Sequence, residues 1–147
     1  MDCGGVGLYS TAADYAKLLG GLLSGGQNIL KPDTVHELLS WQLPDASFVL
    51  DQFFGEYHAI LPPEFPKDMP LNYGLVGAIN RVDIPGKRRA GSVMWYGIAN
   101  CRWWLDHKSG IAARLFVQIL PPGDGAVSEL YDELERAIYQ ALGARSA

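Results

Sequence analysis

The stretch 91–120 constrains the fold of this chain most strongly, because it reads as three strands separated by short turns. Glycines bracket a run at residues 93–98, and two longer apolar runs follow at 100–106 and 112–120. The segment between these two runs, 107–110, has the length of a hairpin loop and ends in glycine. Strands that are apolar on both faces are typical of covered sheets. We therefore expect an antiparallel sheet that is covered on both faces.

Three of the four tryptophans lie in this stretch. Trp103 and Trp104 sit side by side in a predicted strand, where large aromatic side chains usually belong to the core. Trp95 differs, because Tyr96 and Gly97 follow it directly. A glycine inside a strand indicates close approach by a ligand or by another backbone. Trp95 is therefore a candidate for contact with a ligand.

Helices are predicted on both sides of this stretch. Thr11 is the expected N-cap of the first helix, with Asp14 in the position of a capping box, and the Gly25-Gly26 pair ends the helix. Pro32 is suited to the first position of a second, short helix, and residues 48–61 are predicted as a third. The order of helices, then strands, then a last helix indicates a single α+β domain over residues 1–147, with helices on an antiparallel sheet.

The last helix is expected to begin at a Ser128 cap and to end at Gly143. Apolar residues at helical spacing predict its buried stripe: Leu130, Leu134, Ala137, Ile138 and Ala141. The acidic residues of the same helix are expected to face solvent: Glu129, Asp132, Glu133 and Glu135. Two further predictions concern the middle of the chain, namely a proline-rich loop at 61–70 and a strand at 71–80 interrupted by Gly74 and Gly77.

Composition excludes several classes of function. The net charge is −4, and no basic run is longer than residues 87–89, which we expect to form a solvated loop. Binding to nucleic acid or to an anionic membrane is therefore not expected. Cys3 and Cys101 form neither a metal spacing nor a disulfide framework, and the three histidines, His36, His58 and His107, lack partners at metal-ligand spacing. We expect no metal or cofactor, and without a signal or membrane segment a cytoplasmic protein is predicted.

Several short motifs occur in the order in which one enzyme family has them. Residues 4–15 read GGVGLYSTAADY, and later motifs are LLSGG at 22–26, ILKPDTV at 29–35, NYGL at 72–75, GS at 91–92, WYG at 95–97, Asn100, WWLD at 103–106 and QILP at 118–121. In this order the chain resembles the C-terminal portion of the β-lactamase-related serine hydrolases. Within them it is most similar to the branch of family VIII carboxylesterases and fungal acyltransferases of the lovastatin type.

The resemblance implies acyl transfer through a serine of a Ser-x-x-Lys motif, with the lysine and a tyrosine of a second motif as helpers. Residues 95–97 correspond by position to the third motif of the family. The resemblance then implies that the Ile98 backbone amide donates to the oxyanion, that Trp95 walls the acyl pocket and that Gly97 lets the substrate approach. Tyr96 departs from the glycine common in the esterases, which puts the acyl group in question. The Lys108-Ser109-Gly110 triplet has the letters of a third motif but lies in a predicted surface turn.

No Ser-x-x-Lys occurs in the chain, and no tyrosine is followed two residues later by Asn or Ser. The first hypothesis is a part of a serine esterase or acyltransferase that is inactive alone and acts on a small ester or acyl substrate. A second is a non-catalytic binding or partner subunit that keeps an aromatic pocket of Trp95, Tyr96, Trp103 and Trp104. A third is a fragment without a stable fold, because the family's missing first part would leave a sheet edge and a helix face uncovered. A partner chain covering that edge is the alternative to exposure.

Overall fold

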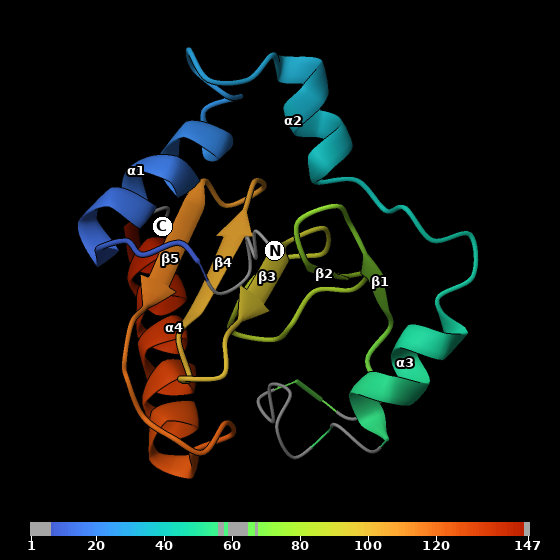
Figure 1. Cartoon of the computed structure of the whole chain (residues 1–147), viewed down its shortest axis with the longest axis vertical. Coiled ribbons are helices and arrows are strands. Elements are labelled where there is room, and N and C mark those ends of the chain that lie inside the picture. Colours follow the sequence, from blue (N-terminus) through green and yellow to red (C-terminus); the bar gives the residue numbers. More distant parts are fainter. Residues whose placement is uncertain (1–6, 56–57, 59–64, 67, 146–147) are drawn as a thin grey trace.

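The computed structural model of the chain describes residues 7–55, 58, 65–66 and 68–145. Its strands form one antiparallel sheet in the order β1-β2-β3-β4-β5 (Figure 1). They are β1 Leu71–Tyr73, β2 Ala78–Asn80, β3 Val93–Tyr96, β4 Arg102–Asp106 and β5 Ile111–Leu115. The helices are α1 Ala12–Leu23, α2 Pro32–Leu38, α3 Ser47–Phe54 and α4 Gly125–Arg145. The predicted α+β class with an antiparallel sheet is confirmed.

The sheet has helices on both faces, as its apolar strands predict. Neighbouring residues of a strand point to opposite faces, and in β4 they meet different helices. The Trp103 ring lies 6.4 Å from the Tyr15 ring of α1, and the Trp104 ring lies 5.3 Å from the Tyr131 ring of α4. Figure 1 shows α1 in front of β5 and α4 behind it. Trp104 is buried, as predicted, whereas Trp103 is half-buried.

The predicted start and end of the first helix and the predicted start of the second are confirmed. The Asp14 N–H donates to Thr11 Oγ1 at 3.1 Å, and the Thr11 hydroxyl donates back to the Asp14 carboxylate at 3.0 Å. Gly25 and Gly26 adopt φ of 78° and 97° just after α1, a backbone conformation that favours glycine. The second helix begins at Pro32 as predicted.

The predictions for residues 48–80 are confirmed only in part. The third helix ends at Phe54 rather than at residue 61, and residues 56–57, 59–64 and 67, which include much of the proline-rich loop, lie outside the described residues. The interrupted strand at 71–80 is a hairpin of β1 and β2. A side chain at Gly77 would collide with the Met94 carbonyl of β3, and one at Gly74 would lie 2.9 Å from Ile79. The glycines therefore mark a tight turn and close backbone approach rather than a weakened single strand.

The end of the sheet also differs from its prediction. β5 ends at Leu115, and the run up to residue 120 leaves the sheet to follow the β3–β4 turn. Hydrogen bonds hold it there: the Cys101 thiol donates to the Val117 carbonyl at 2.9 Å, and the Ile119 N–H donates to the Ala99 carbonyl at 3.3 Å. Strand periodicity does not distinguish such a covered extended segment from a strand.

The predictions for α4 are largely wrong. Asp124 caps the helix, since its carboxylate accepts from the Val127 N–H at 2.9 Å, and the helix continues past Gly143. The expected buried stripe is exposed: Leu130 by 44%, Leu134 by 44% and Ile138 by 37%. Ala137 and Ala141 are exposed as well. The buried residues of α4 are instead Val127, Ser128, Tyr131 and Glu135.

An ion-pair network explains why α4 buries a different face from the one that the sequence predicts. Arg88 and Glu135 are both fully buried, and the guanidinium donates to the two carboxylate oxygens at 2.7 Å each. The buried Lys87 ammonium pairs with Asp132, which also accepts from the exposed Arg136. The predictions of a solvated loop at 87–89 and of a solvated Glu135 are therefore wrong; within the loop only Arg89 is exposed. Oppositely charged residues 47 positions apart fix the face that α4 buries.

Asp106 accepts hydrogen bonds from three separate segments of the chain. The stability of the fold therefore depends on whether the Asp106 carboxyl is ionised. Burial raises the pKa of Asp106, but hydrogen bonds from the Arg89 N–H, the Tyr139 hydroxyl and Ser109 outweigh burial and leave it below its ordinary value. Burial and the Asp106 carboxylate raise the pKa of the Tyr139 hydroxyl far above its ordinary value.

Stability is therefore expected to fall on both sides of neutral pH. Below about pH 4 the unfolded chain takes up protons that the folded Asp106 resists, and above about pH 10 the unfolded chain loses protons that the folded Tyr139 keeps. Urea unfolding from pH 2.5 to 11 measures this. In Asp106→Asn the free energy of unfolding should fall less steeply at acid pH than in the parent chain. An equally steep fall would contradict the role of Asp106.

No helix in the described part of the chain combines the length and the apolarity needed to cross a bilayer.

Candidate functional site

The four residues singled out from the sequence lie where β3 turns toward β4. Trp95 and Tyr96 are the last residues of β3, whereas Gly97 and Ile98 already belong to the turn. The expected strand 93–98 is thus two residues too long. The Gly97 N–H donates to the Cys101 carbonyl and the Asn100 N–H to the Gly97 carbonyl, both at 2.9 Å. These bonds close a tight turn that presents Ile98 at its tip.

Gly97 and Ile98 are both exposed residues. Ile98 is 73% exposed, and its N–H donates to none of the residues that the structure describes. A side chain at Gly97 would meet no atom within 4 Å, so packing among the described residues does not require a glycine there. A backbone N–H that has no partner among the described residues is chemically able to donate to a developing negative charge on a substrate oxygen.

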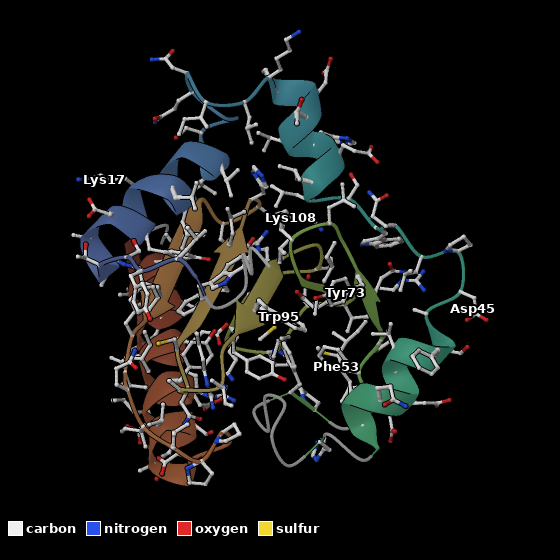
Figure 2. The ribbon with its side chains drawn as sticks, viewed as in Figure 1. Lys17, Asp45, Phe53, Tyr73, Trp95 and Lys108 are labelled. Carbon is white, nitrogen blue, oxygen red and sulfur yellow. The ribbon has the colours of Figure 1, made fainter. Side chains whose placement is uncertain are left out.

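Aromatic rings line the other side of this strand end. The Trp95 ring lies 5.3 Å from the Tyr73 ring of β1, edge to face, and 6.2 Å from the Phe53 ring of α3. The Tyr96 ring is 5.3 Å from the Trp95 ring. Figure 2 shows Phe53, Tyr73 and Trp95 gathered between β3 and α3. Burial raises the pKa of the Tyr73 hydroxyl above its ordinary value.

The aromatic pocket suggested by the sequence is wrong for Trp104, which is only 2% exposed and packs under α4, so that it is closed to a ligand. Trp103 lies directly opposite Trp95 in the β3–β4 register and therefore on the same face of the sheet, but its ring packs near Tyr15 of α1 and beside the Leu105 cluster. The rings nearest to the Trp95 ring belong to Phe53 of α3, Tyr73 of β1 and the neighbouring Tyr96. Sequence reasoning missed Phe53 and Tyr73, because their proximity to Trp95 depends on the β1–β2 hairpin.

Asn100 is a further residue whose structural role the sequence does not indicate. It is buried, with φ of 63°, and its side chain bridges the turn to the segment that precedes α4. Its amide nitrogen donates to the carbonyls of Ile119 and Pro121 at 2.8 and 2.9 Å, and its amide oxygen accepts from the Gly123 and Asp124 N–H groups. Asn100 therefore fixes the turn that carries Ile98.

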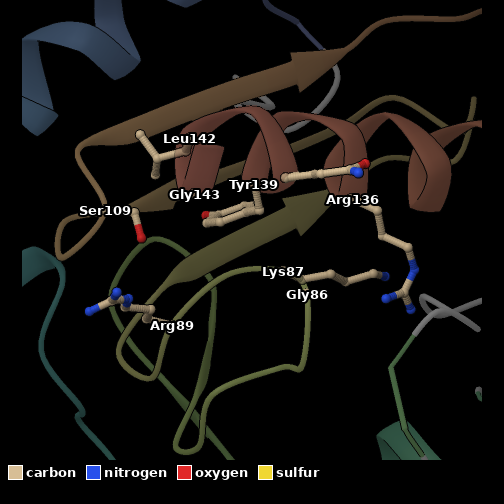
Figure 3. Close-up of a pocket in the computed structure, with 9 residues that line it drawn as sticks. Gly86, Lys87, Arg89, Ser109, Arg136, Tyr139, Leu142 and Gly143 are labelled. Atoms are coloured by element: carbon tan, nitrogen blue, oxygen red, sulfur yellow. The ribbon is translucent and has the colours of Figure 1, made fainter. Parts of the chain in front are cut away.

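The Lys108-Ser109-Gly110 triplet lies far from this turn, in the loop between β4 and β5. That loop is at the end of the sheet where β3 begins. Ser109 lines a cavity of about 600 Å³ between the 86–89 loop and α4 (Figure 3). The Lys87 and Arg136 side chains of this cavity both pair with Asp132. The expectation that the triplet lies in a turn is confirmed.

Comparison with known proteins finds relatives of this chain among fungal acyltransferases. No family model matches the chain. A monacolin J acid methylbutanoyltransferase of Aspergillus terreus is 31% identical over 92% of the chain and 34% of its own length. The acyltransferase calJ of Penicillium decumbens is 30% identical over 86% of the chain and 31% of its own length. This chain is a homologue of the C-terminal part of the fungal lovastatin-type acyltransferases.

The structural comparison agrees with the sequences. Unliganded simvastatin synthase from Aspergillus terreus superposes with a TM-score of 0.79 and 28% identity, over 85% of this chain and 32% of that enzyme. The β-lactamase-related resemblance of the sequence is thereby confirmed. The chain spans about a third of the length of the relatives it matches.

Proposed function

We propose that this chain supplies the strand end and the oxyanion donor of a serine acyl-transfer site. The observation that carries the proposal is the Ile98 N–H in the turn after Trp95, which donates to none of the described residues and belongs to a residue that is 73% exposed, in a chain whose relatives are named as acyltransferases. Gly97 supports the proposal, because the described residues leave room for a side chain at this position and so do not explain why it is glycine. The substrate is a small ester or another acyl donor.

In the proposed reaction a serine hydroxyl attacks the acyl carbonyl, and negative charge develops on the carbonyl oxygen. The Ile98 N–H donates to that oxygen, and one such donor is worth about 10²–10³ in rate. Trp95 packs against the acyl chain, and Tyr96 limits its size. Collapse of the intermediate expels the alcohol, and a second alcohol or water later takes the acyl group from the serine. The nucleophile, its lysine and the base tyrosine lie outside these 147 residues, since the sequence contains neither motif.

The purified chain alone is expected not to hydrolyse a p-nitrophenyl ester above the buffer rate. Fusing it behind the first two thirds of the Aspergillus terreus relative, in place of that enzyme's own C-terminal part, should give a hydrolase. In this fusion Ile98→Pro removes the amide and should lower the rate by about 10²–10³. Ser109→Ala, in the Lys108-Ser109-Gly110 triplet, is the control and should leave the rate unchanged. An equal loss in both variants, or in neither, would contradict the site.

A non-catalytic role in ligand binding is the alternative, favoured by the half-buried aromatic rings around Trp95. Octanoate can serve as a simple acyl probe, and binding should quench tryptophan fluorescence saturably. Trp95→Phe should remove most of the quenching, whereas Trp41→Phe, at an exposed tryptophan outside this group, should not. Binding by the isolated chain together with an inactive fusion would favour this alternative over catalysis.

We further propose a cytoplasmic location for the protein. We also propose a polypeptide partner for the part of the sheet that the described residues leave uncovered. The exposed apolar stripe of α4 supports the second point, because a helix on the surface of a soluble domain normally presents polar residues to water.

A further inference from the structure

The cavity of about 600 Å³ between the 86–89 loop and α4 has a basic lining, although the net charge of the chain is −4 (Figure 3). Its charged lining residues are Lys87, Arg89 and Arg136, and none of the described carboxylates belongs to the lining. Neutral polar side chains of Ser109, Tyr139 and Gln140 complete its polar part. Cations that converge on one cavity are typical of a site for an anion.

The carboxylates behind the cavity do not balance its cations. Asp132 pairs with both the buried Lys87 ammonium and the Arg136 guanidinium. A Glu135 carboxylate oxygen lies 3.8 Å from the Lys87 ammonium, but its hydrogen bonds of 2.7 Å come from the Arg88 guanidinium. Two carboxylates therefore serve three cations on this side of the cavity. The excess positive charge attracts an anion.

The Arg136 guanidinium is held in place but keeps donors to spare. Its Nε donates to Asp132 at 2.7 Å, and its Nη1 donates to the Pro85 carbonyl at 3.2 Å. A side chain at Gly86 would lie only 3.2 Å from the same Nη1, so glycine leaves room for the guanidinium against the loop. A guanidinium has five N–H donors. Those that these two contacts leave unused can bind an oxygen-rich ligand, because the side chain is 53% exposed.

Arg89 adds a cation at the other end of the cavity, opposite Lys87 and Arg136 in Figure 3. Its backbone N–H donates to Asp106 at 3.0 Å, which anchors the residue. That carboxylate also accepts from the Tyr139 hydroxyl at 2.8 Å and from the Ser109 N–H at 3.1 Å. The Arg89 guanidinium itself makes no hydrogen bond or ion pair with a described residue. It is therefore able to bind a ligand without breaking a contact within the described part of the chain.

We propose that this cavity binds a small molecule through a phosphate group, which Lys87, Arg89 and Arg136 hold. A phosphate carries about −1.5 to −2 charges and three acceptor oxygens, which suits several cations better than a carboxylate does. The carbonyl end of α4 carries a partial negative charge. The phosphate is therefore expected against the 86–89 loop, with the uncharged part of the ligand near Leu142. The volume is that of a site for a small molecule.

This site is separate from the proposed acyl-transfer site and does not rest on it. Ser109 follows β4 at the end of the sheet where β3 begins, whereas Ile98 lies in the turn at the other end. A ligand in the cavity would bridge the 86–89 loop and α4, which the Arg88–Glu135 pair already joins. Binding is therefore expected to stabilise the folded chain.

The test is titration of the purified chain with pyrophosphate, followed by calorimetry at about 0.15 M salt. Arg89→Gln removes a cation from the loop wall, and Gln140→Glu adds a negative charge to the helix wall. Lys108→Gln is the matched control, because it removes a positive charge from the neighbouring turn without touching the residues that line the cavity. All three side chains are exposed, so the variants should fold, which circular dichroism checks.

Saturable binding is expected for the parent chain, with a rise in Tm as pyrophosphate is added. Arg89→Gln and Gln140→Glu should each weaken binding about tenfold or more, since a hydrogen bond to a charged group contributes about that much. Lys108→Gln should bind like the parent chain, because salt screens a charge outside the cavity. Absence of saturable binding would overturn the proposal. So would an equal loss in Lys108→Gln, which indicates general attraction to a basic surface, or binding of acetate as tight as that of pyrophosphate.

Discussion

Replacing Glu135 with alanine is expected to lower the free energy of unfolding by about 3–5 kcal/mol, because it leaves the Arg88 guanidinium buried without its counter-ion. Both side chains are fully buried, and two hydrogen bonds of 2.7 Å join them. Burial lowers the pKa of Arg88, but Tyr131 and Glu135 outweigh burial and raise it, so the charge persists in the folded chain. A loss of this size is a large share of the stability of a small domain.

Two further variants distinguish the loss of the buried Arg88–Glu135 ion pair from the ordinary effect of a substitution in α4. Glu133→Ala changes an exposed carboxylate of the same helix and should stay within about 0.5 kcal/mol of the parent. The double variant Arg88→Met/Glu135→Leu removes both charges and should recover most of the loss, since a buried pair replaced by apolar side chains is often neutral. Urea unfolding with a constant m-value measures all three. Equal stability of Glu135→Ala and Glu133→Ala would refute the role of the pair.

Sequence patterns predicted those parts of the fold that depend on neighbouring residues. The Thr11 cap, the Pro32 start and the 107–110 turn each rest on chemistry within a few positions, and each is confirmed. Periodicity failed for α4, because it ranks apolar residues as buried without knowing what they meet. The Arg88–Glu135 pair joins two distant segments, and the covering for the stripe is not supplied by the described residues.

In the candidate site, too, local sequence patterns do not reveal the residues that long-range packing brings together. The glycine that follows Trp95 and Tyr96 indicates a possible ligand contact at Trp95, whereas the roles expected of Gly97 and Ile98 come only from the resemblance to a family. Phe53 and Tyr73 reach Trp95 through the packing of α3 and β1, which no local pattern encodes. Asn100 was noted as part of the resemblance, but an asparagine after a strand reads as any turn residue. Its function depends on the later segment 119–124.

Asn100→Ala is expected to cost about 2–4 kcal/mol, the second large loss of stability. It deprives two carbonyls and two N–H groups of their partners, at about 1–3 kcal/mol for each group that water does not reach. Alanine keeps the β-carbon that asparagine already has at φ of 63°, a backbone conformation that costs about 1 kcal/mol for a residue other than glycine. Asn100→Gly removes the same hydrogen bonds without this backbone term and should be the more stable variant by that amount. Asn28→Ala, at an exposed turn position, is the control.

The same substitution connects stability to the proposed chemistry, because the Asn100 side chain holds the turn in which the Ile98 amide is presented. In the fusion with the relative's first part, both Asn100 variants should lower ester hydrolysis, and hydrogen exchange at Gly97 should accelerate as its bond to the Cys101 carbonyl loosens. If both variants lose stability but keep the full rate, the orientation of this turn does not matter for acyl transfer. The oxyanion donor would then have to be sought outside the Gly97–Ile98 segment.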